Sequence, residues 1–268
     1  MRRISVSQIS SASWGFERDV AFYASLGVDA IALLRNKVAD VGVAEAQQIL
    51  ATHGLAVSGY GTCGFFSLDE PERWPGEIEA ACRHIELAGV FGASTVTLVT
   101  GSGRGHPYRE SEVAFRSILE QLLPAAEQAG VVIVLEHTGP LRVDLCYIHT
   151  LHDALDLAES VASPHFKICC ELNNAWTERF LYEDLAERSQ WIGLVQISDF
   201  AEGTLATPER VALGDGIIPL ERIVAAIEAS DYAGCYEIEQ LGPEIERVGY
   251  EESLRQSLAF LTQALGRS

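Results

Sequence analysis

The sequence lacks any apolar stretch long enough to cross a membrane. None of its uninterrupted apolar runs approaches the ~20 residues that a bilayer-spanning helix needs. The amino-terminal segment starts with Arg2 and Arg3 but then reaches Ser5, Ser7 and Gln8 instead of the apolar core of a secretion signal. We therefore expect a cytoplasmic protein without a membrane partner.

Positive charge is also scarce in this chain. The 268 residues contain 19 lysines and arginines against 38 aspartates and glutamates, which gives a formal net charge of −19 at pH 7. A molecule of that charge repels the phosphate groups of nucleic acids and of anionic membranes. The composition therefore argues against a nucleic-acid partner and favours a small-molecule substrate.

Cysteine pairs of the kind that bind zinc or form redox centres are missing. The sequence contains six cysteines and no Cys-x-x-Cys pair: Cys63, Cys82, Cys146, Cys169, Cys170 and Cys235. In an intracellular chain such scattered cysteines behave as small apolar residues, so we expect neither disulfides nor a thiolate metal site.

The dominant feature that is present is an alternation of short β-branched runs with longer amphipathic stretches. The runs predict strands at 4–9, 28–34, 55–60, 94–100, 131–136, 166–171, 192–197 and 234–238. The amphipathic stretches predict helices at 15–26, 43–53, 72–89, 109–129, 151–161, 181–189, 220–229 and 249–265. Eight such units in ~250 residues, without a break in composition, are typical of one (β/α)8 barrel, so we expect a single α/β domain over residues 1–268.

Three of the last four predicted strands end in a glutamate: Glu136, Glu171 and Glu239. Active sites of (β/α)8 barrels lie at the carboxyl ends of the strands, where these side chains would converge. Carboxylates so close together repel one another unless a cation lies among them. The pattern therefore indicates a divalent metal site with oxygen ligands. The alternative is that these glutamates are charges at helix starts, or that they form ion pairs with Arg104, Arg142 or Arg210.

Several segments together resemble the xylose-isomerase-like barrel superfamily of sugar isomerases, epimerases and related dehydratases. They are Ile-Ser-Ser-Ala-Ser-Trp at 9–14, Leu-Glu at 135–136, the segments 171–176 and 195–200, Gly-Asp-Gly-Ile-Ile-Pro-Leu at 214–220, and Glu-Ile-Glu at 237–239. The glycine-rich segment is the most specific of these, and the resemblance extends over the whole chain. Relatives are often dimers or tetramers, which implies a possible homo-oligomer.

The resemblance implies a metal ligand set of Glu136, Glu171, Gln196 and Glu239. Two of these depart from the usual Glu, Asp, His, Glu pattern, because glutamate replaces aspartate at 171 and glutamine replaces histidine at 196. An all-oxygen set favours Mn²⁺ or Mg²⁺ over Zn²⁺. A third departure is Asn174, where many relatives carry a histidine that touches substrate.

The activity implied by the resemblance is metal-dependent isomerisation or epimerisation of a sugar-like or cyclic hydroxy-carbonyl compound. A cation that binds the carbonyl and the adjacent hydroxyl acidifies the α-proton and stabilises an enediolate. Glu136 and Glu239 would remove and return the proton. In having a glutamine at position 196, the chain is similar to the bacterial 3-dehydroshikimate dehydratases of the same superfamily, so the resemblance implies a dehydratase or related lyase as the first alternative. A barrel that has lost its catalytic function is the second.

Further candidates lie near the predicted strand ends. His106 and His137 are candidate general acids that could protonate a leaving hydroxyl. The candidate substrate-binding residues are Asn174, Trp176, Trp14, Arg104, Arg210 and Phe66. For the aromatic residues the alternative is ordinary packing, and for the arginines it is a surface position.

Overall fold

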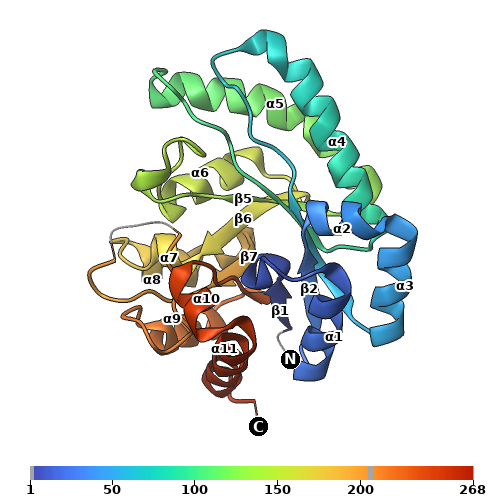
Figure 1. Cartoon of the computed structure of the whole chain (residues 1–268). Helices are drawn as coiled ribbons and strands as arrows, with labels where there is room; N and C mark the ends of the chain where they lie inside the picture. The colour runs from blue at the N-terminus through green and yellow to red at the C-terminus, as the bar shows by residue number, and fades with distance from the viewer. Residues whose placement is uncertain (1–2, 205–207, 268) are drawn as a thin grey trace.

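A closed parallel barrel forms the centre of the molecule. The computed structural model describes residues 3–204 and 208–267. Its strands pair in sequence order, and β8 pairs with β1 to close the sheet (Figure 1). They are β1 (Ile4–Ser7), β2 (Ala30–Leu33), β3 (Ala56–Thr62), β4 (Thr95–Leu98), β5 (Val132–Glu136), β6 (Phe166–Glu171), β7 (Ile192–Ile197) and β8 (Tyr236–Ile238). The predicted (β/α)8 fold is confirmed.

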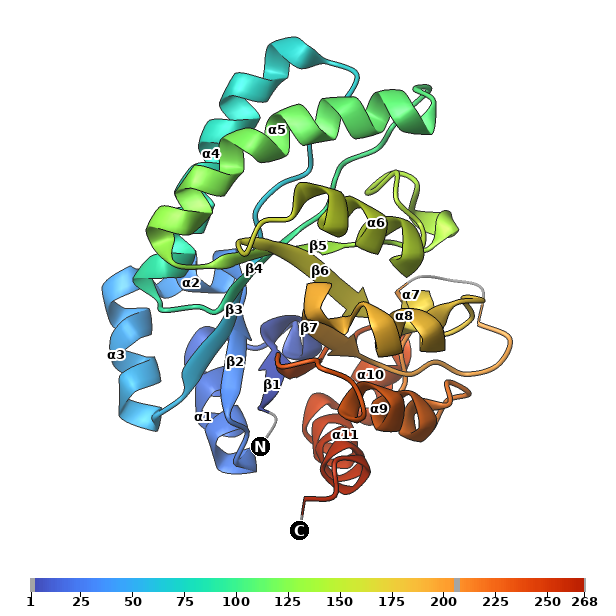
Figure 2. The same cartoon turned by 180° about the vertical axis from the view of Figure 1, so that it is seen from behind.

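Helices follow the strands and cover the outside of the barrel, as Figures 1 and 2 show. The α-helices are α1 (Phe16–Leu26), α2 (Arg35–Val41), α3 (Val43–His53), α4 (Trp74–Val90), α5 (Tyr108–Ala129), α6 (Leu151–Val161), α7 (Leu172–Ala175), α8 (Leu181–Glu187), α9 (Leu220–Glu228), α10 (Pro243–Val248) and α11 (Tyr250–Ala264). Short 3-10 helices occur at η1 (Gln8–Ser11), η2 (Pro71–Arg73), η3 (Pro140–Arg142) and η4 (Ser189–Trp191). The long helices α4 and α5 lie side by side and extend beyond the barrel in both views.

Left-handed glycines end three of the helices just before the next strand. Gly27, Gly54 and Gly130 have φ angles of 75°, 68° and 68°. Glycine reaches this region without the steric cost that a Cβ atom brings, so the chain turns within one or two residues into the following strand.

Two local features differ from the elements that the sequence predicts. The run at 4–9 is a strand only to Ser7, because the chain turns there into η1. The helix α2 was not predicted, since it is only seven residues long. It is separated from α3 by Gly42, whose φ of 85° breaks the helical path.

A buried ion pair fixes both of these unpredicted elements. Lys37 Nζ of α2 lies 2.7 Å from Asp19 Oδ2 of α1, with side-chain exposures of 4% and 0%. The same ammonium donates to the carbonyls of Gln8 and Ser11 in η1 at 3.1 and 2.9 Å. Gln8 in turn donates to Asp19 and accepts from the Leu34 amide. These contacts join η1, α1 and α2 on one side of the barrel mouth.

The alternation of side chains along the strands divides the molecule into two packed regions. Outward-facing residues such as Leu135, Ile168 and Val195 join the large core under the helices. Val134 and Cys169 belong to a second, smaller cluster together with Leu194 inside the barrel. Because successive side chains point to opposite faces of a strand, the residue two positions after each of these also points inward. Those residues are Glu136, Glu171 and Gln196.

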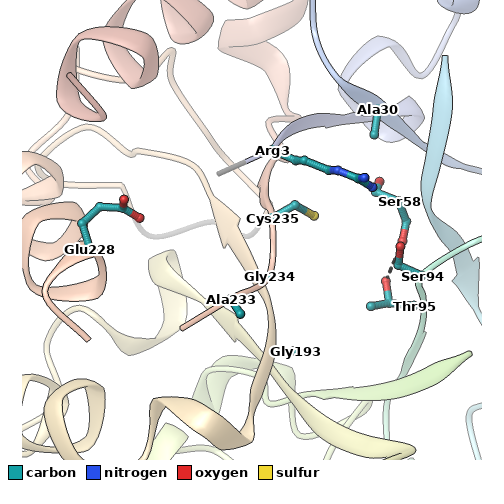
Figure 3. A pocket seen from close by; sticks show the side chains of 10 residues that line it. All are labelled: Arg3, Ala30, Ser58, Ser94, Thr95, Gly193, Glu228, Ala233, Gly234 and Cys235. Carbon is teal, nitrogen blue, oxygen red and sulfur yellow. Dashed lines mark hydrogen bonds between the residues drawn. The ribbon is translucent and has the colours of Figure 1, made fainter. Parts of the chain in front are cut away.

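The amino-terminal end of the barrel is hollow. A cavity of about 610 Å³ lies there, and Figure 3 shows the side chains around it. Most of its lining residues are small: Ala30, Ser58, Ser94, Thr95, Gly193, Ala233, Gly234 and Cys235, with Arg3 and Glu228 as the charged members. Several of them begin strands, so this cavity lies at the end opposite to the glutamates that end β5 and β6.

The six cysteines, all within the described residues, are unpaired. Cys63, Cys146, Cys169 and Cys170 are buried, whereas Cys82 and Cys235 are half-buried. No helix in the described part of the chain is long and apolar enough to cross a membrane.

Candidate active site

A small cavity opens at the carboxyl ends of the strands, where the glutamates meet. Its volume is about 90 Å³, and its polar lining comes from Glu136, Gln196, Glu237 and Glu239 on β5, β7 and the end of β8. The opposite wall consists of the β1–β4 half of the barrel, which contributes backbone and mostly small side chains: Ser7, Ala32, Gly59, Gly61, Thr62 and Thr97. The predicted convergence of strand-end carboxylates is thus seen for Glu136 and Glu239.

Burial, followed by repulsion from neighbouring carboxylates, dominates the electrostatics of these two glutamates. Burial, repulsion from Glu171 and repulsion from Glu237 raise the pKa of Glu136 to about 8, against the opposing charge of Arg210. The pKa of Glu239 is raised well above its ordinary value by burial and by the charges of Glu136, Glu237 and Glu171. Without a cation, Glu136 is therefore mostly protonated at neutral pH, and ionisation of Glu239 is disfavoured.

Glu171 lies at the edge of this group and is held by different contacts. Its oxygens accept hydrogen bonds from the amides of Asn173 and Asn174 at 3.2 and 2.8 Å, at the start of α7. Ser198 Oγ donates to it at 3.1 Å, and Arg210 Nη2 lies 3.8 Å from its Oε2. The carboxylate is buried but has several donors, as a stable buried anion requires.

Arg210 brings a positive charge to the same place from the long connection between β7 and α9. Its Nε donates to Ser198 Oγ at 3.0 Å, and its side chain is 11% exposed. The guanidinium lowers the pKa of both Glu136 and Glu239. Of the two arginines that the sequence singled out for substrate binding, Arg210 is the one beside the carboxylates.

Asp199 organises the connection that carries Arg210. Its carboxylate accepts hydrogen bonds from the amides of Phe200, Gly214, Gly216 and Ile218 at 2.9–3.1 Å. A Cβ atom on Gly216 would lie 2.1 Å from Asp199 Oδ1, so this position requires glycine. The glycine-rich segment thus wraps around a buried aspartate and supports the loop.

Gln196 contacts two glutamates of the neighbouring strand. Its Nε2 donates to Glu239 Oε2 at 2.6 Å and to Glu237 Oε1 at 3.1 Å. Its Oε1 accepts from Cys169 Sγ at 3.2 Å. The sequence prediction missed Glu237, although strand alternation could have found it, since it lies two residues before Glu239 and faces the same way.

Asn174, Trp176 and Phe66 lie around the mouth without lining the small cavity. Asn174 Nδ2 donates to the His137 carbonyl at 3.1 Å. Trp176 is half-buried and packs against Phe200, with ring centroids 5.9 Å apart. Phe66 is buried, and its backbone lies against Gly101, so it joins the loops after β3 and β4.

Four predicted site residues lie apart from the carboxylates. Arg104 is exposed and pairs with Glu70 at 2.8 Å, and His106 is exposed in the same loop. Trp14 packs against Phe22 and Tyr250 on the outside, with ring centroids 5.3 and 5.5 Å away.

His137 is fully buried, with its Nε2 3.6 Å from Glu178, and burial lowers the pKa of His137 to about 4. A histidine that is neutral at pH 7 and faces away from the cavity is poorly suited to donate a proton there. The roles predicted for His106, His137, Trp14 and Arg104 remain predictions that this geometry does not favour.

The donor set at the mouth suits a hard divalent cation. The charges of Glu171 and Glu237 make the ionised forms of Glu136 and Glu239 less favourable, and Arg210 is a cation that opposes this effect. In addition, Glu237 Oε2 is buried without a hydrogen-bond partner in the described part of the chain. Among those same residues no three of His, Cys, Asp or Glu are already grouped as metal ligands, and Glu171 is occupied with α7. The oxygen donors are therefore of the type that a divalent metal ion prefers, but in this structure their side chains are not arranged around one common point.

Three kinds of comparison relate this chain to known proteins. A curated inosose isomerase of Halalkalibacterium halodurans is 24% identical over 143 residues, which are 52% of this chain and 50% of that protein. The match thus spans half the length of that relative.

Solved structures match over nearly the full length. The protein SMc04130 of Sinorhizobium meliloti 1021 is 25% identical, with a TM-score of 0.88 over 97% of this chain and 98% of that one. The IolI protein, solved with a zinc atom, is 17% identical, with a TM-score of 0.86 over 98% and 97% of the two chains. At that identity the IolI likeness concerns the fold. Residues 20–264 match the family profile, and the chain therefore belongs to the xylose isomerase-like TIM barrel family.

Proposed function

We propose that this chain is an enzyme that isomerises or epimerises a sugar-like or cyclic hydroxy-carbonyl compound by removing and returning an α-proton. The observation that carries the proposal is that Glu136 and Glu239, from the ends of β5 and β8, line one cavity and have raised pKa values. The sequence similarity to an inosose isomerase supports a cyclic polyol ketone as substrate class.

Glu136 and Glu239 differ in their surroundings, which gives each a distinct part in the reaction. Glu136 accepts no hydrogen bond from any described residue, so its carboxylate is free to take a proton. Glu239 is held by Gln196 at 2.6 Å and is positioned to return one from the β8 side. A pKa near the working pH is the property that general acids and bases require.

Substrate binding would come from the side chains around the cavity. Arg210 and Asn174 offer hydrogen-bond donors for hydroxyl or carbonyl oxygens, and Trp176 offers an apolar face. Gly59 and Ala32 of the β1–β4 half add little side-chain volume to the cavity wall, which also includes Leu33 and Tyr60.

A divalent metal ion, Mn²⁺ or Mg²⁺, belongs to this proposal. Glu136, Glu171, Gln196 and Glu239 would hold it through oxygen atoms. When bound, it would polarise the substrate carbonyl and favour the ionised carboxylates. The likeness in fold to a zinc-containing protein and the unneutralised charge of the glutamates support it.

The test is proton exchange in D₂O with inososes and ketoses, with and without Mn²⁺. We expect deuterium to enter the substrate at the carbon next to the carbonyl, at a rate that Mn²⁺ increases. Absence of exchange with all compounds of both classes would reject the proposed activity.

Elimination of water is the second candidate, and Gln196 is the observation that favours it. Glutamine at this position distinguishes the chain from the common ligand pattern that the resemblance implies. The same α-proton removal, followed by loss of a β-hydroxyl, gives a conjugated product. Incubation with 3-dehydroshikimate would then produce a new ultraviolet absorbance, whereas an isomerase or epimerase would leave the absorbance unchanged.

A further inference from the structure

Glu237 is a buried carboxylate between the two cavities of the barrel. It is 3% exposed, lines the small cavity at the mouth and pairs in register with Gln196 of β7 and Ser5 of β1. Cys235, two residues earlier and directly before β8, lines the hollow at the amino-terminal end (Figure 3). Inside a barrel, this place is usually filled by a branched apolar side chain. A glutamate at this buried position therefore needs an explanation in terms of function.

The contacts of Gln196 show what this carboxylate does. The two hydrogens of Nε2 point to Glu237 Oε1 at 3.1 Å and Glu239 Oε2 at 2.6 Å, and Oε1 accepts from Cys169. If the amide group were rotated by 180°, Gln196 Oε1 would face the carboxylate oxygens of Glu237 and Glu239, and neither contact would be a hydrogen bond. The pair of glutamates therefore determines which way the amide of Gln196 faces.

Glu237 also leaves one oxygen unused. Its Oε2 forms no well-aligned hydrogen bond among the described residues, although the Ser58 hydroxyl is near enough to lower the pKa of Glu237, and a Cβ atom built on the facing Gly59 would lie 3.8 Å from it. An unpartnered buried oxygen costs free energy, so stability alone does not explain an acid at this position.

We propose that Glu237 is a positioning residue, which holds the Gln196 amide by accepting from Nε2 and thereby fixes the orientation in which Gln196 donates to Glu239, a proposed metal ligand. This inference rests on the proposed function. When Glu239 is engaged by a cation, Glu237 is the acceptor that remains for Nε2. Residues that bind to a metal ligand without contacting the metal fix the orientation of that ligand. Their loss typically weakens metal binding by about 10- to 100-fold.

Two substitutions at one position separate this role from an effect of charge. Glu237→Leu removes the acceptor, whereas Glu237→Gln removes the charge but keeps a carbonyl oxygen that can accept from Nε2. Calorimetric titration of the full-length chain with Mn²⁺ should give a Kd about 10- to 100-fold higher for Glu237→Leu. The Glu237→Gln variant should stay within about 3-fold of the unchanged chain. Equal weakening by both variants, or no weakening by Glu237→Leu, overturns the proposal.

A double-mutant comparison tests whether Glu237 acts through Gln196. In a Gln196→Ala background, Glu237→Leu should change the Mn²⁺ affinity by less than about 2-fold, since the side chain to be positioned is gone. An undiminished effect of Glu237→Leu in that background would make Glu237 a direct ligand or a simple charge, and would overturn the positioning role.

A second measurement needs no metal and keeps the two proposals distinguishable. The side-chain NH₂ signals of Gln196 in ¹H–¹⁵N spectra should shift in Glu237→Leu and remain close to the original positions in Glu237→Gln. Glu237→Ala serves in place of Glu237→Leu if the latter does not fold. Unchanged signals in the leucine or alanine variant overturn the positioning role. Absence of Mn²⁺ binding by the unchanged chain would instead count against the proposed metal-dependent function. The ¹H–¹⁵N spectra would still show whether Glu237 orients the Gln196 amide.

Discussion

Each carboxylate at the barrel mouth is held differently, and these differences decide which one can exchange a proton. Glu171 is occupied by the amides at the start of α7, by Ser198 and by Arg210. Glu239 accepts one strong hydrogen bond from Gln196, and Glu136 accepts none within the described part of the chain. The acid–base work is therefore expected from Glu136 and Glu239.

Removing either proton-transfer group should abolish most of the activity. Glu136→Gln and Glu239→Gln keep the size of the side chain but cannot take up a proton, so we expect proton exchange to fall by about 10²- to 10⁴-fold. The exposed Glu187→Gln is the matched control and should exchange at the original rate. Full exchange in both active-site variants would contradict the two-glutamate mechanism.

Arg210 should control the pH dependence of the reaction. Its charge lowers the pKa of Glu136 and Glu239, so Arg210→Gln should raise both values. The base must be ionised to react, and the rising limb of the pH–rate profile should therefore move to higher pH, by about one unit.

The same profile for Arg83→Gln provides the control for that shift. Arg83 is an exposed arginine that pairs with Glu79 on the surface of α4. Its loss should leave the profile in place. An unshifted profile in the Arg210 variant would mean that this arginine does not act on the proton-transfer groups.

At the scale of secondary-structure elements, the ion pair between α1 and α2 should contribute strongly to stability. Lys37→Met leaves Asp19 buried without its cation, and a broken buried pair typically costs about 3–5 kcal/mol. Urea denaturation measures this loss. Arg18→Met, which breaks the exposed pair with Glu251, should cost less than about 1 kcal/mol. Equal losses in the two variants would contradict the structural role of the Asp19–Lys37 pair.

The loop between β7 and α9 should be sensitive to a single methyl group. In Gly216→Ala the new Cβ would clash with Asp199 Oδ1 and the Phe200 carbonyl, so the loop that carries Arg210 must move. We expect activity to fall more than about 10-fold, with the barrel retained by circular dichroism.

Gly76→Ala in α4 is the matched control for the Gly216 substitution. A Cβ atom there meets nothing within 4 Å, and alanine favours a helix by roughly 0.5–1 kcal/mol. This variant should keep full activity and lose no stability. Normal activity in Gly216→Ala would show that the loop tolerates displacement.

Elements defined by a regular pattern could be predicted from the sequence, and those defined by tertiary contacts could not. The bounds of β6, β7, α3 and α6 follow from the hydrophobic period and, for α3, from the glycines on either side of it. The short helices η1 and α2 depend on the contact between Lys37 and Asp19, which no local pattern reveals. Likewise, the positions of Glu136 and Glu239 at strand ends marked them as candidate site residues. The proposed role of Glu237 depends on its hydrogen bond with Gln196 of the neighbouring strand, which the sequence does not reveal.

At the scale of the whole molecule, the buried acids should make metal-free stability depend on pH. The pKa values of Glu136 and Glu237 rise in the folded chain from an ordinary 4.5 to about 8 and about 7, both chiefly through burial. The folded state therefore binds more protons than the unfolded state in this range, and stability falls as pH rises through it. His137, with a pKa lowered from 6.5 to about 4, acts in the opposite direction below pH 6.5.

The clearest window for this effect lies between pH 6.5 and pH 8. There we expect the free energy of unfolding of chelator-treated protein to drop by about 1–2 kcal/mol. Glu136→Gln should flatten the decline, and Mn²⁺ should reduce it, because a cation favours the ionised carboxylates. Chemical denaturation across this range measures the effect. A stability that rises with pH would contradict the assigned protonation states.

The mouth of the barrel has two unlike halves. Strands β5–β8 supply the carboxylates and the amide, whereas β1–β4 line the same cavity with Ser7, Ala32, Gly59 and Thr97. The reacting groups thus come from one stretch of the chain, and most of the facing cavity wall comes from another. Mutation of the amino-terminal half can reshape the space offered to a substrate while the reacting groups stay in place. A family built in this way can acquire new substrates by changing one half of its barrel and inheriting the other.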